Sequence, residues 1–461
     1  MAPGQNPTTI DVNSFTSLRL STLRDPMVWG GYYSQPELDS IIPGTLRKDT
    51  SDYIKTAYCK DTANWFHSVQ YVPLYQDREV FVSRIHSMTD TVALLNPGKL
   101  MTLGTWKFVT DVNRGVHIYD DKNPTQPKEV AFLNVPGVLD IALKNNTLYA
   151  NAYNALVAID ITDPTHASVQ KFVPNAFPTV YSYGGPLMDS LGNVAVAWRA
   201  DTLLTCGIYY AEDMVRTNTG IDIAVSGTAT EVVPQSTAVL GTNASLSRFA
   251  ISSDWLYAVD QTALRLFDIR SENAPRIGPV VQTDTWGLET IFRSGTGLFL
   301  GSMTGLLIYD HAAGGIPVKA SDYAHITSCD PVVVQNGIAF VTLSATQTRC
   351  HNGSNELDVI DVSDLYNPKL LTKFPMQSPS GLAVKDSTLF VCEGEQGLAV
   401  LDIKKPAEPA IISRLTTISP EDVIADQGIL TLLGPSGIWR YSYADRTDLT
   451  LLSFTPSTSS N

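Results

Sequence analysis

The 461-residue chain is 44% hydrophobic and only 17% charged, a balance that supports a large packed core. Its formal net charge of −14 argues against binding to nucleic acid, because phosphate recognition needs clustered lysine and arginine. No stretch approaches the roughly 18 consecutive apolar residues of a membrane helix, so we expect no transmembrane segment.

The first 75 residues are rich in Pro, Gly, Ser and Thr and show no sustained period, so we interpret residues 1–75 as an N-terminal tether or docking arm. Its opening letters, MAPGQNPTTI, lack the basic start and apolar centre of a signal peptide. A lead-in segment follows at residues 76–96, with a short helix expected near Arg78 to Met88. Residues 457–461 form a C-terminal tail.

Residues 97–456 repeat one phrase: an apolar strand closed by an acid, a turn ending in proline, and another apolar run. Examples are ALVAIDITDPTHASVQKFV at 155–173 and GLAVLDIKKPAEPAIISRL at 397–415. The closing position of the phrase is occupied by Asp120, Asp160, Asp268, Asp310, Asp361, Asp402 and Ser442. Most intervals are about 40 to 50 residues, which is typical of the four-stranded blades of a β-propeller.

The number of blades depends on the long interval between Asp160 and Asp268. We expect a diverged blade with insertions there, built around residues 193–213, which favours eight blades. Seven is the alternative, if this segment is only an insertion. The eight expected blades span residues 97–134, 135–176, 177–241, 242–282, 283–324, 325–376, 377–416 and 417–456.

Aligned inner strands place one position of each blade at the same height on the central channel. This position is occupied by charged residues in most blades, with Gly381 as the exception: Lys99, Asp140, Arg248, Glu289, Asp330 and Asp422. Inner strands converge on the propeller axis, so we expect these side chains to approach one another.

Two interpretations of this ring stay open. Its carboxylates could bind Ca²⁺ through oxygen ligands, or bind a polar, glycan-like ligand together with the two bases. Alternatively, the acids bond to backbone amides of neighbouring blades or pair with the bases, and so fix the register of the blades. Repetition in most blades favours the architectural role.

Loops that precede the inner strands form one rim of the propeller, where ligands or partners commonly bind. The candidate rim residues are Trp286, His325, Ser380 and Glu421. The alternative is a solvated rim with Trp286 packed on the adjacent blade.

Five cysteines contain no C-x-x-C pair, which argues against zinc or thioredoxin-like chemistry. Cys329 and Cys350 flank a hairpin-length segment. A disulfide between them would close a loop of about 20 residues and stabilise the fold by roughly 3 kcal/mol. The alternative is two free buried thiols.

Catalytic signatures are absent from the sequence. The seven histidines stand singly, and no nucleophile elbow, phosphate-binding loop or dinucleotide fingerprint occurs. We therefore predict no catalytic residue and no cofactor apart from the Ca²⁺ considered for the channel.

The phrases LDVIDVSD, LVAIDITDP and LAVLDIKKP resemble the LVIVD repeat of bacterial and archaeal cell-surface proteins. More specifically, NPGKL, SCDPVVV with the later TRC, and LFVCEGEQGL resemble a group of Bacteroidetes lipoproteins with that repeat. The resemblance covers about residues 70 to 456. It implies a β-propeller, export, lipid attachment near the amino terminus and display at the outer membrane, but no established activity.

One departure from that pattern concerns the anchor. No lipobox opens this sequence, and Cys59, preceded by IKTAY, does not provide one. We expect that a leader and lipid-bearing cysteine lie outside this sequence or that the protein is secreted.

The expected function is that of a non-enzymatic extracytoplasmic scaffold, or an accessory subunit, that holds a protein partner at the cell surface or outer membrane. The alternative is a receptor or enzyme for a small ligand or cation that uses the channel carboxylates. Fold alone does not decide between them.

Overall fold

The structure is a computed structural model. It describes residues 46–48, 65–90, 92–177, 181–182, 185–186, 188–189, 191–206, 242–243, 246–260, 262–285, 287–302, 305–311, 315–324, 331–344 and 354–458. Of residues 46–48, 65–74, 181–182, 185–186, 196–206 and 242–243 it describes the backbone alone.

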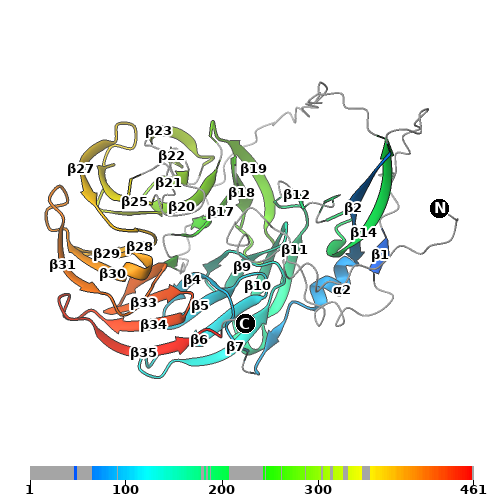
Figure 1. Ribbon diagram of the computed structural model, residues 1–461, viewed down its shortest axis with the longest axis horizontal. Coiled ribbons are helices and arrows are strands. Elements are labelled where there is room, and N and C mark those ends of the chain that lie inside the picture. Colours follow the sequence, from blue (N-terminus) through cyan, green and yellow to red (C-terminus); the bar gives the residue numbers. More distant parts are fainter. Residues whose placement is uncertain are drawn as a thin grey trace. The chain divides into compact units, whose positions relative to one another are not determined.

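Seven antiparallel sheets form the blades of a β-propeller (Figure 1). Six of them have four strands, and the sheet of blade 1 has six because a short strand joins each of its edges. The favoured count of eight blades is therefore corrected to the alternative of seven. The described part of residues 177–241 provides no blade, because its long strand pairs elsewhere.

The strands of each blade follow one another in chain order from the axis outward. The inner strands of blades 1 to 7 are β4 (Pro97–Leu103), β8 (Ile141–Lys144), β16 (Phe249–Ser252), β20 (Leu288–Ser294), β24 (Val332–Gln335), β28 (Leu382–Lys385) and β32 (Asp422–Asp426). The second strands are β5 (Trp106–Asp111), β9 (Thr147–Ala152), β17 (Trp255–Val259), β21 (Gly297–Ser302), β25 (Ile338–Leu343), β29 (Thr388–Cys392) and β33 (Ile429–Gly434).

The third strands carry the repeated acid at their ends. They are β6 (Gly115–Asp120), β10 (Ala155–Asp160), β18 (Ala263–Asp268), β22 (Gly305–Asp310), β26 (Glu356–Asp361), β30 (Leu398–Asp402) and β34 (Gly437–Ser442). The outer strands are β7 (Lys128–Asn134), β11 (Ser168–Val173), β19 (Arg276–Gln282), β23 (Val318–Ala324), β27 (Lys369–Pro375), β31 (Ala410–Leu415) and β35 (Thr450–Pro456).

The inner strands form a closed ring, since each contacts the inner strand of the next blade and β32 of blade 7 contacts β4 of blade 1. An apolar cluster fills this closing interface and includes Leu100, Tyr119, Leu433 and Ile438. The propeller is thus closed by packing and not by a strand exchanged between its first and last blades.

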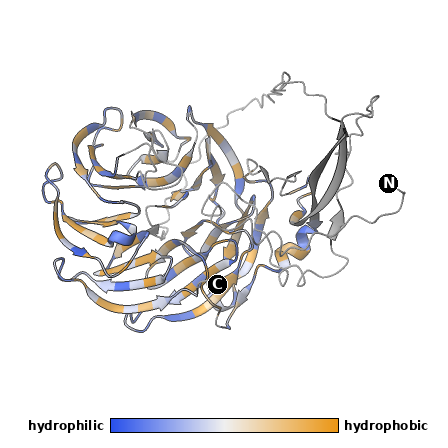
Figure 2. Ribbon diagram, in the orientation of Figure 1, coloured by the Kyte–Doolittle hydropathy of each residue, from blue (hydrophilic) through white to orange (hydrophobic). Residues whose placement is uncertain are grey.

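Burial follows the position of a strand within its blade. Strands β9 and β21 are buried along their whole length, because each middle strand is covered by neighbouring blades on both faces. The outer strand β19 exposes or half-exposes every residue. Hydrophobic residues accordingly gather along the strands of the blades (Figure 2).

The repeated acid shapes the turn between the third and outer strands. In five blades its Oδ1 accepts a hydrogen bond of 2.8 to 3.0 Å from the backbone N–H two residues later. Ser442 does the same through Oγ at 3.3 Å. This Asx-type turn precedes the outer strand, and in every blade a register shift of the β-bulge kind interrupts the pairing of the third strand with the outer strand. The sequence signature is therefore a structural device.

Blade 1 gains a strand at each edge. On the outer edge, β3 (Ser87–Met88) pairs with β7. On the channel side, β15 (Thr242–Asn243) pairs with β4. The lead-in helix is α2 (Arg78–Ser83), which is shorter than expected and buries Phe81 against Tyr153 and Phe172 of blade 2.

A second unit combines the end of the N-terminal arm with the insertion that follows blade 2. Its strand β2 (Trp65–Gln76) pairs with β14 (Val194–Cys206) on one side and with β1 (Leu46–Lys48) on the other. A two-residue pair, β12 (Tyr181–Ser182) with β13 (Gly185–Pro186), belongs to the same unit. The arm thus includes a long paired strand.

The helices in these ranges are short: besides α2 there are the 3₁₀ turns η2 (Pro164–His166) and η4 (Gly394–Gln396). No helix in the described ranges has the length and hydrophobicity to cross a membrane.

Candidate functional site

The central channel brings together five of the six charged residues predicted for it. Lys99, on β4, interacts electrostatically with Asp140, Asp422, Arg248 and Glu289 from four other blades. The sixth, Asp330, lies outside the described residues, as do the rim candidates Trp286 and His325 and the cysteines Cys329 and Cys350.

Asp140 precedes β8 and is only 2% exposed. Its carboxylate accepts hydrogen bonds from the backbone N–H of Ile141 at 2.8 Å, from Ser247 Oγ at 3.3 Å and from the backbone N–H of Arg248. Ser247 and Arg248 begin blade 3. Asp140 therefore fastens the inner edge of blade 2 to the inner edge of blade 3.

Asn151 supports the backbone around Asp140. Its Oδ1 accepts hydrogen bonds of 2.8 Å from the backbone N–H groups of Leu139 and Asp140, and its Nδ2 donates to the carbonyl of Gly137 at 2.6 Å. A buried amide thus satisfies three backbone groups at the start of blade 2, which is how irregular buried backbone is usually stabilised.

Lys99 contacts the segment that returns from the insertion. Its ammonium donates a hydrogen bond to the carbonyl of Leu246, three residues beyond β15. Since β15 pairs with the channel side of β4, the chain's own backbone occupies this part of the channel. Lys99 and β15 together attach the returning segment to blade 1 before it enters blade 3.

Burial governs the protonation of the channel groups. It raises the pKa of Asp140, although the Lys99 charge and the N–H groups of Arg248 and Ile141 favour the carboxylate. It also raises the pKa of Glu289, with Arg248 and Lys99 acting in the opposite direction. Burial lowers the pKa of Lys99, which Asp140 and Asp422 partly offset. The acids and bases of the ring thus stabilise one another's charges in a poorly solvated space.

Asp422 and Gly381 explain the break in the charged pattern at blade 6. Asp422 is 1% exposed, and its carboxylate accepts a hydrogen bond of 3.0 Å from the backbone N–H of Val423. A Cβ atom on Gly381 would overlap Asp422 Oδ1 and lie 2.6 Å from the carbonyl oxygen of Glu421. Gly381 is therefore required by the close approach of blade 7.

Ser380 and Glu421, the two described rim candidates, meet at the boundary between blades 6 and 7. Ser380 Oγ donates to the carbonyl of Glu421 at 3.1 Å and to that of Cys392 at 3.2 Å, and Gly381 N–H donates to the Glu421 carbonyl at 2.9 Å. The Glu421 side chain is exposed. Ser380 thus joins two blades, and Glu421 takes part in this junction through its backbone carbonyl.

Two charges of the ring make the contacts that the architectural interpretation expects. Within the described ranges, no group of three or more His, Cys, Asp and Glu side chains is placed to hold a metal ion. Asp140 and Lys99 instead bond to the chain's own backbone. A Ca²⁺ ion or a polar ligand in the channel stays a prediction.

Sequence inspection did not find a buried charge network in blade 1. His117, fully buried, places Nδ1 2.7 Å from Glu129 Oε1 and Nε2 3.5 Å from Asp111 Oδ2. Asp111 also accepts the N–H groups of Leu95 and Asn96 and pairs with Arg114. The available signal was a histidine between the apolar residues Val116 and Ile118 of the strand GVHIYD.

Opposing effects set the pKa values in this network. Burial lowers the pKa of His117, but its hydrogen bonds to Asp111 and Glu129 outweigh burial and leave it raised. Burial raises the pKa of Asp111, but His117, Arg114 and two backbone N–H groups leave it lowered.

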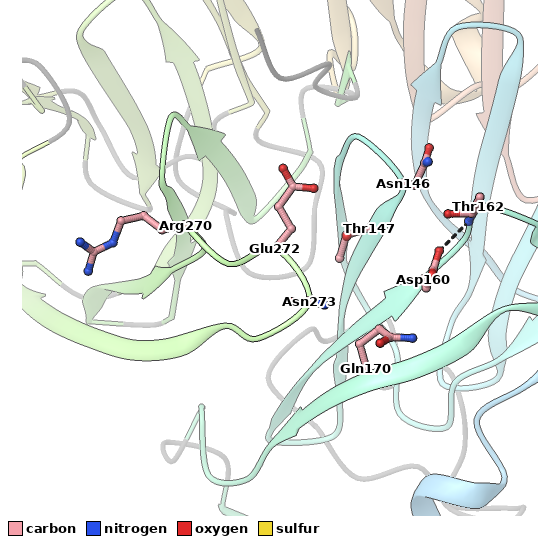
Figure 3. A pocket seen from close by; sticks show the side chains of 8 residues that line it. All are labelled: Asn146, Thr147, Asp160, Thr162, Gln170, Arg270, Glu272 and Asn273. Atoms are coloured by element: carbon pink, nitrogen blue, oxygen red, sulfur yellow. Dashed lines mark hydrogen bonds between the residues drawn. The ribbon is translucent and has the colours of Figure 1, made fainter. Parts of the chain in front are cut away.

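A second candidate site is a polar cavity of about 400 Å³ between blades 2 and 3 (Figure 3). It lies at the ends of the strands where the repeated acids stand. Its lining residues are Asn146, Thr147, Asp160, Thr162, Gln170, Arg270, Glu272 and Asn273. Sequence analysis missed this cavity because it depends on side chains from two blades.

Comparison with known proteins identifies the repeat. The LVIVD repeat model matches residues 138–172, 352–374 and 379–417, which fall in blades 2, 5 and 6. The predicted LVIVD repeats are thus present, whereas the closer resemblance to Bacteroidetes lipoproteins stays a prediction. No curated protein matches the chain.

Several solved structures are distantly similar to this chain. A protein from Lactobacillus plantarum is 12% identical, with 79% of this chain and 97% of that chain covered and a TM-score of 0.49. The periplasmic gluconolactonase of Pseudomonas aeruginosa is 9% identical, with 78% and 97% covered and a TM-score of 0.48. A putative 6-phosphogluconolactonase from Bacteroides uniformis is 10% identical, with 81% and 97% covered and a TM-score of 0.48. Similarity at this level carries no statement about function.

Proposed function

We propose that this protein is a non-enzymatic, extracytoplasmic β-propeller that holds a protein partner, as a scaffold or accessory subunit of a surface or outer-membrane complex. The observation that carries the proposal is the use of the channel charges by the chain itself. Asp140 binds the backbone of blade 3, and Lys99 binds the returning segment at Leu246. Side chains committed to such contacts are poorly suited to turning over a substrate.

Exposed apolar residues on blades 4 and 5 support a role in protein binding. Ile316, Val318 and Tyr366 are 55%, 63% and 60% exposed, and Leu370 and Leu371 on β27 are also exposed. We call these five residues the blade 4–5 patch.

Contacts bring the two blades together at this patch. Tyr366 Oη donates a hydrogen bond of 3.3 Å to Asp310, which pairs with Val318 across the sheet. Tyr366 of blade 5 and Val318 of blade 4 are thus brought near each other through Asp310, and exposed apolar residues that gather in this way commonly mark an interaction site.

Site-specific photo-crosslinking in the native surface fraction tests the proposal. A photoreactive residue at Val318 or Tyr366 should give one discrete cross-linked product, and the same probe at Ile277 on blade 3 serves as the matched exposed control. The scaffold proposal fails if no exposed position yields a product that survives competition by unlabelled protein.

The second candidate, a receptor or enzyme that uses the channel carboxylates, is favoured by the raised pKa values of Asp140 and Glu289. Elemental analysis and calorimetry with Ca²⁺ test it. Stoichiometric metal that is lost in a Glu289→Gln variant would favour this candidate over the scaffold.

A further inference from the structure

On the rim that carries the repeated acids, the same two positions face each other across a groove between blades 2 and 3, blades 4 and 5, and blades 6 and 7. One wall is the residue that begins the second strand of a blade and pairs with that blade's closing residue. This hairpin position is occupied in blades 1 to 7 by Trp106, Thr147, Trp255, Gly297, Ile338, Thr388 and Ile429.

The other wall comes from the next blade, four residues after its own closing residue. Among the described residues this loop position is occupied in blades 1, 2, 3, 5, 6 and 7 by Pro124, Pro164, Glu272, Leu365, Pro406 and Arg446. Only blades 2 and 6 carry threonine at the hairpin position, so only these two have a hydroxyl group facing the groove from that position.

In the groove between blades 6 and 7, the side chain of Arg446 fills the space between the two walls. Arg446 Nη1 donates to Thr388 Oγ1 at 2.9 Å, to Ser387 Oγ at 3.3 Å and to the Ser387 carbonyl at 3.4 Å. Its Nη2 lies 3.7 Å from Asp402 Oδ2. A hydroxyl, a turn carbonyl and the repeated acid thus surround a guanidinium group.

The groove between blades 4 and 5 is also filled, but with different chemistry. Leu365 stands at the loop position, and its Cδ2 would lie 3.1 Å from a Cβ placed on Gly297. The next residue, Tyr366, donates its hydroxyl to Asp310, the repeated acid of blade 4. The side chain that fills a groove therefore matches the residue at the hairpin position. A leucine packs over glycine in one groove, and a guanidinium group binds beside threonine in the other.

The groove between blades 2 and 3 has the threonine and the acid, and no side chain among the described residues occupies it. Thr147 and Asp160 correspond to Thr388 and Asp402, and Asn146 corresponds to Ser387. Glu272 stands where Arg446 stands. The Glu272 side chain contacts residues of blade 2 that precede Asn146 and Thr147. Its Oε1 accepts a hydrogen bond from Asn145 Nδ2 at 2.6 Å and lies 3.8 Å from Lys144 Nζ.

The result is the cavity of about 400 Å³ (Figure 3). Its walls are fixed, because Tyr149 Oη donates to the Glu272 carbonyl at 2.8 Å and Lys144 Nζ donates to the Ser253 carbonyl at 3.0 Å. Both bonds join blade 2 to blade 3, so the groove needs little ordering to receive a ligand.

Charge in this groove suits a cation. Asp160 is ionised at neutral pH, since hydrogen bonds from Thr162 lower its pKa, and Glu272 adds a second carboxylate. The cation in the lining, Arg270, is paired with Asp268 at 2.5 Å, and in Figure 3 its side chain points away from Asp160. A cationic ligand therefore meets the carboxylate of Asp160, the carboxylate of Glu272 beside Lys144, and an arginine that is already paired with Asp268.

We propose that the groove between blades 2 and 3 binds the guanidinium group of an arginine side chain on a partner protein, in the position that Arg446 occupies between blades 6 and 7. This inference rests on the proposed scaffold function and names the chemistry of one contact. Arginine suits the groove because its planar group carries five donors for hydroxyl, carbonyl and carboxylate acceptors together. A lysine would supply the charge but not the fork of donors.

Calorimetry with the full chain tests the proposal. The probe is a short peptide with blocked ends and a single arginine, and the same peptide with citrulline is the neutral control. The arginine peptide should bind at one site per chain, and the citrulline peptide should bind at least about tenfold more weakly.

Substitutions locate the site. Thr147→Val removes the hydroxyl with little change of shape, and Asp160→Asn removes the charge while keeping an oxygen for the turn. Each should weaken binding about tenfold. Asp361→Asn, in the same turn of blade 5, is the matched control and should leave binding unchanged.

Exchange at the loop position gives the sharpest outcome. Glu272→Arg should fill the groove from within and abolish binding of the peptide. Arg446→Glu should open the second groove and raise the stoichiometry from one peptide to two. Binding that is absent in the natural chain, or unaffected by both exchanges, overturns the proposal.

The outcome is separable from that of the scaffold proposal. Peptide binding with these responses supports the arginine site even if photo-crosslinking finds no partner. A cross-linked partner that is retained in full by the Glu272→Arg variant overturns the arginine contact and leaves the scaffold function standing.

Discussion

The guanidinium of Arg440 in blade 7 lies 2.7 Å, from Nε to Oδ2, from the carboxylate of Asp121 in blade 1. The two side chains are 0% and 3% exposed, and the Arg440 guanidinium also lies over the ring of Tyr119. Residues 319 positions apart in sequence thus form a buried ion pair at the interface that closes the propeller.

Removing one partner of this ion pair should strongly destabilise the closed propeller. Arg440→Leu leaves the Asp121 carboxylate buried without its main partner, so we expect a loss of about 3 to 5 kcal/mol in the free energy of unfolding. Urea denaturation measures it. The double variant Arg440→Leu, Asp121→Leu should recover much of the loss; an equal or greater loss would contradict the pairing.

The stability of the central channel should depend on the carboxylate of Asp140. Asp140→Ala removes the acceptor for Arg248 N–H and Ile141 N–H, so we expect a loss of about 2 kcal/mol and faster exchange of those two amides. Hydrogen exchange read by mass spectrometry follows the peptides that contain them. Asp254→Ala, which removes an acid with a 58% exposed side chain, is the control. Equal behaviour of the two variants would refute the assigned role.

His117 should make stability depend on pH. Its pKa is raised in the folded state, so its contribution is full below the unfolded value of about 6.5 and is lost as the pH rises through the folded pKa. Asp111 has a lowered pKa, so its contribution is full above about pH 4 and is lost as the pH falls through the folded pKa.

Thermal unfolding of the natural protein and a His117→Phe variant between about pH 6 and pH 9 checks the histidine. The natural protein should lose stability as the pH rises above about 6.5, and the variant should show a smaller slope. Identical slopes would show that His117 does not titrate as described.

Gly381 should not tolerate a side chain. Gly381→Ala places a Cβ against Asp422 and the Glu421 carbonyl, so we expect a loss of about 2 to 3 kcal/mol. Gly295→Ala is the comparison, because no atom of a described residue beyond its chain neighbours lies within 4 Å of its added Cβ, and backbone strain of about 1 kcal/mol applies. The close approach of blades 6 and 7 is refuted if the two variants lose the same amount.

The sequence predicted what repetition encodes. Asp160, Asp268 and Asp402 recur at the ends of the third strands because the same turn recurs, and so the blades could be located from them. The gathering of Lys99 and Asp140 at the channel also followed, since equivalent positions of inner strands must converge on the axis.

Pairings that occur only once could not be predicted. Strand β14 pairs with β2 of the N-terminal arm, and no periodic signal links these two segments, so the prediction of an eighth blade between blades 2 and 3 is wrong. Arg440 and Asp121 likewise meet only because the ring closes. The difference between Glu272 and Arg446 has meaning only after the two grooves are compared in space.

A crystal structure of the protein grown with Ca²⁺ tests the central claim, that the channel charges hold the chain's own backbone. We predict that the Asp140 carboxylate bonds to the Arg248 N–H, that the Lys99 ammonium bonds to the Leu246 carbonyl, and that no ion lies between them. A Ca²⁺ ion coordinated at about 2.3 to 2.6 Å by oxygens of Asp140, Glu289 or Asp422 would contradict the claim.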